Sequence, residues 1–224
     1  MCTTGKDFWN KSGHLFKGTT SATEDNQAVA WPALQRELEK LPKKDHLRVL
    51  DFGCGAGQLS HLLGKDNRYE IVGLDPAANM ISQANEQATQ GVTFVEGTIC
   101  NLASMRPFDA IVSSMVFQFV NEVGSYFRRL EASLRAGGAL AFVVFNPAFI
   151  GDQLKTKTDL FAIDQCGCLQ MILEGRPTPV YSRSASDYEA FLTKAGFALP
   201  SAYVKPYHQD NCAERFLIIS CKKS

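Results

Sequence analysis

Short apolar runs alternate along the chain with longer segments in which apolar residues recur at helical spacing. The runs are rich in β-branched residues and predict buried strands, which span residues 48–52, 69–75, 92–96, 108–114, 139–145 and 216–221. The segments between them predict helices at residues 59–65, 78–89 and 123–134, and Gly137-Gly138 can end the last of these. Strands that alternate with helices form a parallel sheet covered on both faces. We therefore expect an α/β, doubly wound fold.

Two stretches of the chain fit this alternation poorly. Residues 1–42 precede the first predicted strand, and we expect them to form an N-terminal helical lid on a main domain at residues 43–224. Residues 147–183 form a long insertion after the fifth predicted strand. Because long insertions in compact domains are often lids or binding loops, we expect this one on the substrate side. The alternative is a surface insertion with no role in binding.

A further helix is predicted near the end of the chain. Ser186 and Glu189 match a capping box, in which a hydroxyl and a carboxylate satisfy free backbone NH groups at a helix start. The helix that they open should run to Ala195, where Gly196 can end it.

Composition and charge narrow the classes of partner. A chain of 224 residues that is 45% hydrophobic suits one domain with a substantial core. Lys+Arg and Asp+Glu both number 23, whereas nucleic-acid-binding domains usually carry a basic excess, so no nucleic-acid partner is expected. No apolar run is long enough to span a bilayer, and the first residues lack the apolar core of a secretory signal.

The cysteines point to a reducing compartment. Their number, seven, is odd and their spacing is irregular, which favours reduced thiols in a soluble, cytoplasmic protein. Cys166 and Cys168 form a tighter pair that can bind a soft ion. No second pair of cysteines completes a tetrahedral site, so we expect no resident metal.

A glycine loop follows the first predicted strand. Asp51 lies near the end of that strand, and Gly53, Gly55 and Gly57 follow at every second position. Ligands of open parallel sheets bind at the carboxyl ends of the strands, and glycine there lets the backbone approach them closely. Asp75 ends the second predicted strand, where a carboxylate can accept hydrogen bonds from both ribose hydroxyls of a nucleoside.

Three kinds of nucleotide-binding loop compete for this pattern. The dinucleotide fingerprint needs a glycine where Gln58 stands, and the phosphate-binding loop needs a glycine at Leu59 and a hydroxyl at Asp66. The remaining pattern, D-x-G-x-G-x-G, suits a nucleoside without phosphates, because its acidic residue would repel a pyrophosphate. That pattern favours a ligand with an amino group and a sulfonium.

Residues 49–58, followed by residues 72–76 and Met80, resemble the class I S-adenosylmethionine-dependent methyltransferases. The resemblance covers roughly residues 31–222 and is closest to the methyltransferase type 11-like, small-molecule group that includes the ubiquinone/menaquinone-type enzymes. It implies a mostly parallel, Rossmann-like sheet of seven strands in the order 3-2-1-4-5-7-6, with strand 7 antiparallel. It also implies S-adenosyl-L-methionine as cofactor, S-adenosyl-L-homocysteine as product and a small-molecule methyl acceptor.

The resemblance also assigns cofactor-binding positions. The glycine loop would lie under the methionine moiety, Asp75 would bind the ribose, and Pro76 and Met80 would pack on the adenine. Thr98 stands where the family usually has an acidic residue at the adenine edge, so its contact would be weaker. The full implied set is Asp51, Gly53, Cys54, Gly55, Gly57, Asp75, Pro76, Met80, Gly97, Thr98, Ile99, Ser113 and Ser114.

No catalytic residue can be read from the sequence, because a sulfonium methyl group is already activated and the enzyme mainly aligns the reactants and excludes water. For an acceptor that needs a general base, the candidates are His14, His208 and Tyr181. The expected substrate contacts are Trp9, Phe117, Phe119, Asn146, Arg183 and Tyr207. Phe8, Trp9, Phe16 and Trp31 either cover the cofactor or belong to an ordinary core.

Other functions remain open at this point. The same fold serves protein and RNA methyltransferases, and a non-catalytic protein can keep the S-adenosylmethionine site. Methylation of a soft metalloid such as arsenite would use Cys166, Cys168 and a third thiol. An NAD-dependent enzyme on a related fold is disfavoured by Gln58.

Overall fold

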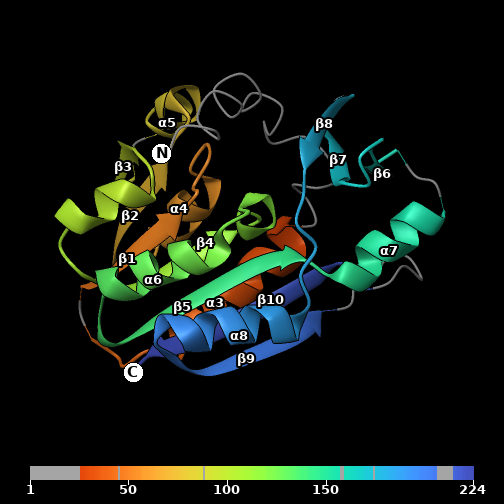
Figure 1. Ribbon diagram of the computed structural model, residues 1–224. Helices are drawn as coiled ribbons and strands as arrows, with labels where there is room; N and C mark the ends of the chain where they lie inside the picture. The colour runs from red at the N-terminus through yellow and green to blue at the C-terminus, as the bar shows by residue number, and fades with distance from the viewer. Residues whose placement is uncertain (1–25, 45, 88, 157–158, 174, 206–213) are drawn as a thin grey trace.

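A seven-stranded sheet forms the centre of the computed structural model, which describes residues 26–44, 46–87, 89–156, 159–173, 175–205 and 214–224 (Figure 1). Five strands run parallel: β1 (Leu47–Phe52), β2 (Tyr69–Asp75), β3 (Val92–Glu96), β4 (Phe108–Ser114) and β5 (Leu134–Phe145). β10 (Phe216–Lys223) lies antiparallel between β5 and β9 (Phe197–Lys205). The sheet order β3-β2-β1-β4-β5-β10-β9 confirms the predicted topology, because β9 and β10 are the sixth and seventh strands of this sheet.

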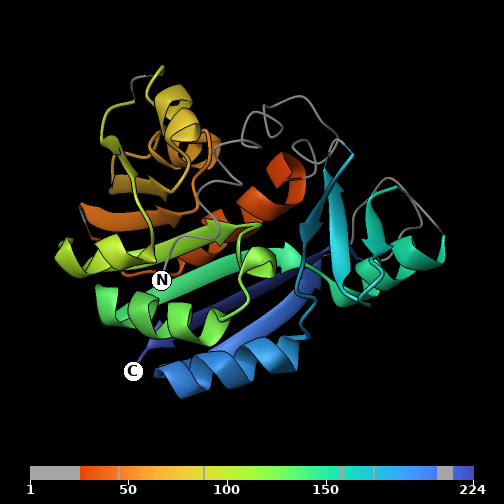
Figure 2. The same cartoon turned by 45° about the horizontal axis from the view of Figure 1, so that its top comes forward.

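Helices cover both faces of the sheet, as the apolar strands require. One face carries α3 (Trp31–Glu39) and α4 (Gln58–Leu63), whose buried residues pack with Val49, Ile71 and Val143. The other face carries η3 (Ile99–Ser104), α6 (Val123–Ser133) and α8 (Ala185–Ala195), which pack with Leu50, Val72 and Phe142. Figure 2 shows α6 and α8 side by side in front of the sheet and α3 behind it. α5 (Ala78–Ala84) follows β2 and contacts β2 and β3.

A second, smaller sheet follows β5. After α7 (Pro147–Lys155) come β6 (Phe161–Ile163), β7 (Leu169–Leu173) and β8 (Arg176–Pro179), which pair antiparallel in that order. These elements occupy the stretch predicted as an insertion, and they lie beyond the carboxyl end of β5 (Figure 1). The sequence did not predict their strands, since runs of three to five residues carry little periodicity.

The described part of the predicted N-terminal lid packs on the sheet. η2 (Asn26–Ala30) leads into α3, which contacts β4 and β5. Trp31 is 8% exposed and belongs to the same apolar cluster as Leu34 and Val143, so it is core rather than a cover. Phe8, Trp9, His14 and Phe16 lie outside the described residues.

Two predicted helix boundaries are wrong. α8 is capped by Ser184 rather than Ser186: the Ser184 hydroxyl accepts a hydrogen bond from Asp187 N, and the Asp187 carboxylate accepts one from Ser184 N. Its predicted end is confirmed, since Gly196 takes a left-handed φ of 101° after Ala195. Gly137-Gly138 do not end α6, because Leu134 is already extended and pairs with Phe108, which places both glycines inside β5.

The remaining boundaries differ by smaller amounts. α4 begins at Gln58 and ends at Leu63, and α5 ends at Ala84, five residues before the predicted end at Thr89. None of the described helices has the length and apolar character needed to cross a membrane.

Candidate functional site

The glycine loop joins the carboxyl end of β1 to α4 and lies beside the end of β2. Gly53, Gly55 and Gly57 have φ values of 76°, 54° and 79°, a region that residues with a side chain rarely adopt. The backbone NH of Gly53 donates to Leu74 O at 2.8 Å, which ties the loop to β2. The sequence pattern therefore corresponds to a loop whose conformation requires glycine.

The three glycines differ in what surrounds them. A Cβ on Gly57 would lie 2.5 Å from Phe94 Cζ, and one on Gly53 would overlap the side chain of Val116. A Cβ on Gly55 would meet no atom within 4 Å. Gly53 and Gly57 are therefore needed for packing inside the protein, whereas Gly55 borders open space, where a ligand can lie against the backbone.

Asp75 connects the end of β2 to this loop. Its Oδ2 accepts a hydrogen bond from Gly55 N and its Oδ1 accepts one from Ala77 N, both at 2.9 Å. Asp75 is only 9% exposed. Burial raises the pKa of its carboxyl by more than the two hydrogen bonds lower it. The acid predicted to bind the ribose is thus held in a fixed position beside the loop.

Asp51 lies beneath the loop rather than on its open side. The residue is 1% exposed, and Ser60 Oγ donates to its Oδ2 at 2.6 Å. Burial raises the pKa of Asp51 to about 7, and the nearby charge of Asp75 adds to the shift. Cys54 also points inward, because its Sγ would lie 2.9 Å from a Cβ added to Gly73. The described contacts give both residues a supporting role under the loop.

The residues predicted to contact the adenine lie in the segments after β2 and β3. Met80 is 4% exposed and Ile99 3% exposed, while Pro76 and Gly97 are half-buried. Thr98 caps η3, since its hydroxyl accepts from Cys100 N at 3.3 Å and its own NH donates to Asn101 Oδ1 at 2.8 Å. The sequence analysis missed Asn101, although Thr98-x-x-Asn101 has the spacing of a capping pair.

The end of β4 completes this edge of the sheet. Ser113 is fully buried and donates its hydroxyl to Phe52 O at 2.8 Å, so that hydroxyl stabilises the β1–β4 junction. Ser114 is half-buried at the last position of the strand. Met115 follows with a φ of 61°, which is unusual for a residue with a long side chain and is typical of functional sites.

Several residues predicted to contact substrate have other partners in the structure. Phe117, in η4 (Phe117–Phe119), is fully buried and stacks on Phe52 with ring centroids 5.9 Å apart. Asn146 caps α7 by accepting from Ala148 N, and its Nδ2 donates to Glu214 O at 2.8 Å. Phe119 is half-buried at the end of η4. Trp9, His14, Tyr207 and His208 lie outside the described residues.

Arg183 binds the loop after β4. Its guanidinium donates to the carbonyl oxygens of Phe117 at 3.2 Å, Val120 at 2.8 Å and Asn121 at 2.7 Å. It also lies 5.2 Å from the ring centroid of Tyr181, whose backbone NH donates to Gln118 O at 2.7 Å. This arginine therefore holds the segment around η4 in place.

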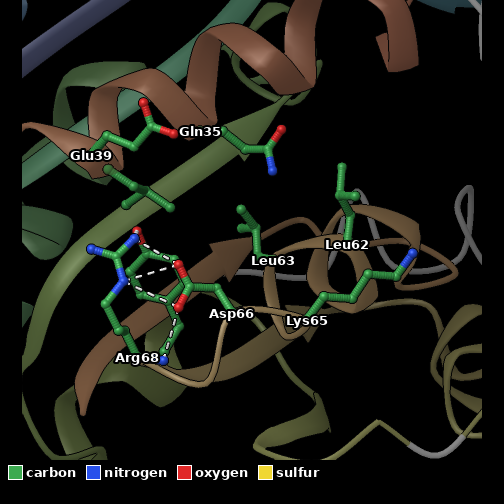
Figure 3. Close-up of a pocket in the computed structure, with 9 residues that line it drawn as sticks. Gln35, Glu39, Leu62, Leu63, Lys65, Asp66 and Arg68 are labelled. Carbon is green, nitrogen blue, oxygen red and sulfur yellow. Dashed lines mark hydrogen bonds and ion pairs between the residues drawn. The ribbon is translucent and has the colours of Figure 1, made fainter. Parts of the chain in front are cut away.

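A hollow of about 340 Å³ lies at the opposite end of the strands (Figure 3). It is bounded by α3, the end of α4 and Tyr69, the first residue of β2. Asp66 and Arg68, which line it, form an ion pair with an N–O distance of 2.6 Å. Because ligands of such sheets bind at the carboxyl ends of the strands, we place the functional site at the glycine loop and not in this hollow.

Within the described part of the chain, no group of three metal-binding side chains is present. Cys166 and Cys168 are exposed in the turn between β6 and β7, and their backbone NH groups both donate to Asp164 Oδ1. The described residues therefore offer this pair no third ligand.

Comparison with known proteins agrees with the fold and the position of the loop. Residues 50–142 match the methyltransferase domain family, a range that includes the glycine loop, Asp75 and β4. A trans-aconitate 2-methyltransferase from Afipia carboxidovorans is 30% identical over 105 residues, which cover 46% of this chain and 41% of that protein. A ubiquinone biosynthesis O-methyltransferase from Bradyrhizobium sp. is 30% identical over 115 residues, covering 50% of this chain and 45% of that protein.

The fold extends the similarity beyond the matched segment. A crystal structure from Listeria monocytogenes, named as a candidate S-adenosylmethionine-dependent methyltransferase, superimposes with a TM-score of 0.71 at 20% identity, covering 88% of this chain and 99% of that one. The chain spans less than half the length of the two relatives above. The glycine loop, Asp75 and β4 thus lie in a segment, residues 50–142, that matches the methyltransferase domain family, and the fold around it resembles that of a structure named for S-adenosylmethionine-dependent methyl transfer.

Proposed function

We propose that this protein transfers the methyl group of S-adenosyl-L-methionine to a small-molecule acceptor and releases S-adenosyl-L-homocysteine. One observation carries the proposal: Asp75 Oδ2 is hydrogen-bonded to Gly55 N, beside the one loop glycine whose added Cβ would meet open space. The acid proposed to bind the ribose therefore lies next to a backbone segment that borders open space. The relatives named for trans-aconitate and ubiquinone biosynthesis support a small acceptor.

In this proposal the chain mainly positions the reactants. Gly53, Gly55 and Gly57 would hold the methionine moiety, with Asp51 and Cys54 supporting the loop from below. Asp75 would bind the ribose hydroxyls, and the adenine would lie among Pro76, Met80, Gly97, Thr98 and Ile99. Ser114, at the end of β4, would border the methyl group, with Ser113 holding that strand end against Phe52. When bound, the cofactor supplies an activated sulfonium methyl group, and no general base is required for an acceptor that is already nucleophilic.

The elements after β5 provide a wall for the acceptor. α7 and the sheet of β6, β7 and β8 lie beyond the carboxyl end of β5, on the same edge as the glycine loop (Figures 1 and 2). We propose that residues 147–183 bound the acceptor site. Exclusion of water by such elements favours displacement at the methyl group over side reactions.

Calorimetric titration with S-adenosylmethionine, S-adenosylhomocysteine and NAD tests the cofactor. The wild-type protein should bind both sulfur ligands and not NAD. Asp75→Ala should lose about 1.5–3 kcal/mol of their binding free energy, because two ribose hydrogen bonds to a buried carboxylate disappear. Asp75→Asn, which keeps one acceptor oxygen, should lose less.

Asp109→Asn is the matched control, since Asp109 lies at the amino end of β4 and pairs with Arg135. Failure of the wild type to bind either sulfur ligand would refute the proposal.

Two alternatives predict different outcomes. A non-catalytic binding protein would bind S-adenosylmethionine but release no S-adenosylhomocysteine with any acceptor. Arsenite methylation would require Cys168, so full retention of activity in Cys168→Ser would exclude it. A protein or RNA acceptor would be revealed by transfer of labelled methyl groups to macromolecules in preference to small molecules.

A further inference from the structure

Gln118 presents an unpaired acceptor beside the proposed site. The residue lies in η4, directly after β4, and is 2% exposed. Its Nε2 donates to Met115 O at 3.2 Å, while its Oε1 is buried and has no hydrogen-bond partner among the residues that the structure describes. A buried acceptor left unpaired costs free energy, and folded proteins pair nearly all such atoms. Oε1 is therefore an atom to which a bound molecule can supply the missing donor.

The neighbours of Gln118 contact the glycine loop. Val116 fills the space beside Gly53, where an added Cβ would overlap its side chain. Phe117 stacks on Phe52, the residue immediately before Gly53, with ring centroids 5.9 Å apart. The segment that carries Gln118 thus packs directly on the loop proposed to hold the methionine moiety.

The position of Gln118 is fixed by its surroundings. Tyr181 N donates to its backbone oxygen at 2.7 Å, and Arg183 donates to the carbonyl oxygens of the residues around it. Met115, which accepts from the Gln118 amide, holds a left-handed φ of 61°. A polar group held in this way is preorganised, so it binds a partner without losing further conformational entropy.

The chemistry of the amide limits what it can bind. Its NH₂ group is already hydrogen-bonded to Met115 O, so the free atom is an oxygen that accepts and cannot donate. An ionised carboxylate would place negative oxygens against Gln118 Oε1, whereas a hydroxyl or an amine would donate a hydrogen bond to it. We propose that Gln118 Oε1 binds an uncharged O–H or N–H group next to the attacked atom, and so selects acceptors that carry such a donor.

This inference rests on the proposed methyl transfer, and acceptors that differ in one donor test it. Catechol and 2-methoxyphenol both offer a hydroxyl for methylation, but only catechol has a second hydroxyl beside it. Release of S-adenosylhomocysteine is measured for both, and for trans-aconitate, with the wild type, Gln118→Met and Ser133→Ala. Ser133 is the control, because it is also buried, at 8% exposed, but its hydroxyl donates to Leu130 O at 2.8 Å at the amino ends of the strands, away from the glycine loop.

The wild type should prefer catechol over 2-methoxyphenol by about 10-fold in kcat/KM, because a site with a buried polar group rejects a ligand that leaves it unpaired. Gln118→Met should lower this preference to about 1, and Ser133→Ala should keep it. A change in folding stability alters both rates together and leaves their ratio unchanged. The inference is overturned if Gln118→Met keeps the preference, if the wild type favours 2-methoxyphenol or trans-aconitate, or if the cofactor-bound wild type methylates none of the three. Failure of the proposed function appears separately, as a wild type that does not bind S-adenosylmethionine or that transfers no methyl group to any acceptor, small or macromolecular.

Discussion

The carboxylate of Asp75 accepts a hydrogen bond from the backbone NH of Gly55 at 2.9 Å, across the gap between the end of β2 and the glycine loop. The same carboxylate accepts from Ala77 N, at the start of the segment proposed to contact the adenine. One side chain therefore sets the relative positions of the backbone segments that would hold the two halves of the cofactor. In the proposed site, cofactor binding would therefore be coupled through Asp75 to the order of this loop.

The two loop glycines Gly55 and Gly57 should respond differently to alanine. Both have positive φ, so each substitution costs about 1 kcal/mol of backbone strain. Gly57→Ala also places a methyl group 2.5 Å from Phe94 Cζ and 2.9 Å from Ala84 Cβ, which raises the expected loss of stability to about 2–4 kcal/mol. The free energy of unfolding, measured in urea, should separate the two variants.

Affinity for the cofactor product should separate Gly55→Ala and Gly57→Ala in the opposite way from stability. The added methyl group of Gly55→Ala meets no protein atom and extends into the space proposed for the cofactor. We expect this variant to keep most of its stability and to lose at least about 10-fold in affinity for S-adenosylhomocysteine, measured by calorimetry. Unchanged affinity in Gly55→Ala would place the ligand elsewhere.

The strands of this fold are predictable from the sequence because they are buried on both faces. β5 is the clearest case: Val143 and Val144 pack on opposite faces of the sheet, so residues 139–145 appear as one continuous apolar run. Asp51 and Asp75 end such runs, which is why the glycine loop and its partner acid could be located. The start of α8 could not be, because Ser184 with Asp187 and Ser186 with Glu189 have the same spacing and a local pattern cannot choose between them.

The contacts that hold the segment after β4 are not encoded locally. Arg183 binds the carbonyl oxygen of Phe117, 66 residues earlier in the chain, and no periodicity links the two. The sequence therefore suggested a substrate-binding arginine, whereas in the structure Arg183 binds backbone carbonyl oxygens of the loop after β4. Gln118 was missed for the same reason, since an unpaired buried oxygen is visible only once the surrounding chain is in place.

Asp51 should make stability depend on pH. Its folded-state pKa of about 7 lies above the ordinary value of 3.8, so between these values the folded protein binds more protons than the unfolded chain. Stability should therefore be highest on the acid side and fall as the pH rises toward 7. Asp51→Asn removes this titration and should be more stable than the wild type at pH 8, by on the order of 2–4 kcal/mol, with the difference vanishing near pH 4.

Urea unfolding of both proteins across this pH range provides the measurement. The pKa of Asp75 is raised in the same direction, and Asp75 is present in both proteins. The difference between the two therefore reports Asp51 together with its electrostatic coupling to Asp75. Equal stability of the two proteins at pH 8 would show that Asp51 ionises without penalty in the folded state.

Arg183 should support the acceptor site without binding the acceptor. Arg183→Lys keeps the positive charge but cannot reach the carbonyl oxygens of Phe117, Val120 and Asn121 together. We expect a loss of about 1–3 kcal/mol of stability and a fall in kcat/KM for neutral and anionic acceptors alike, with unchanged affinity for S-adenosylmethionine. Arg176→Lys, at an exposed position in β8, serves as the control. A loss confined to anionic acceptors would instead make Arg183 an anion-binding residue.

The cap of α8 gives the sharpest test of a helix boundary. Ser184 Oγ accepts from Asp187 N at 3.2 Å, and removal of such a cap costs about 1 kcal/mol, so Ser184→Ala should lower the free energy of unfolding by that amount. Ser186 lies in the first turn of the helix, where its hydroxyl is 2.9 Å from Ser184 Oγ. Because alanine is a better helix former than serine, Ser186→Ala should change stability by less than about 0.5 kcal/mol. Tyr188 and Leu192 attach this helix to the sheet, so the loss in Ser184→Ala should appear in global unfolding as well as in hydrogen exchange of the first turn. A larger loss in Ser186→Ala than in Ser184→Ala would mean that the helix begins two residues later in solution.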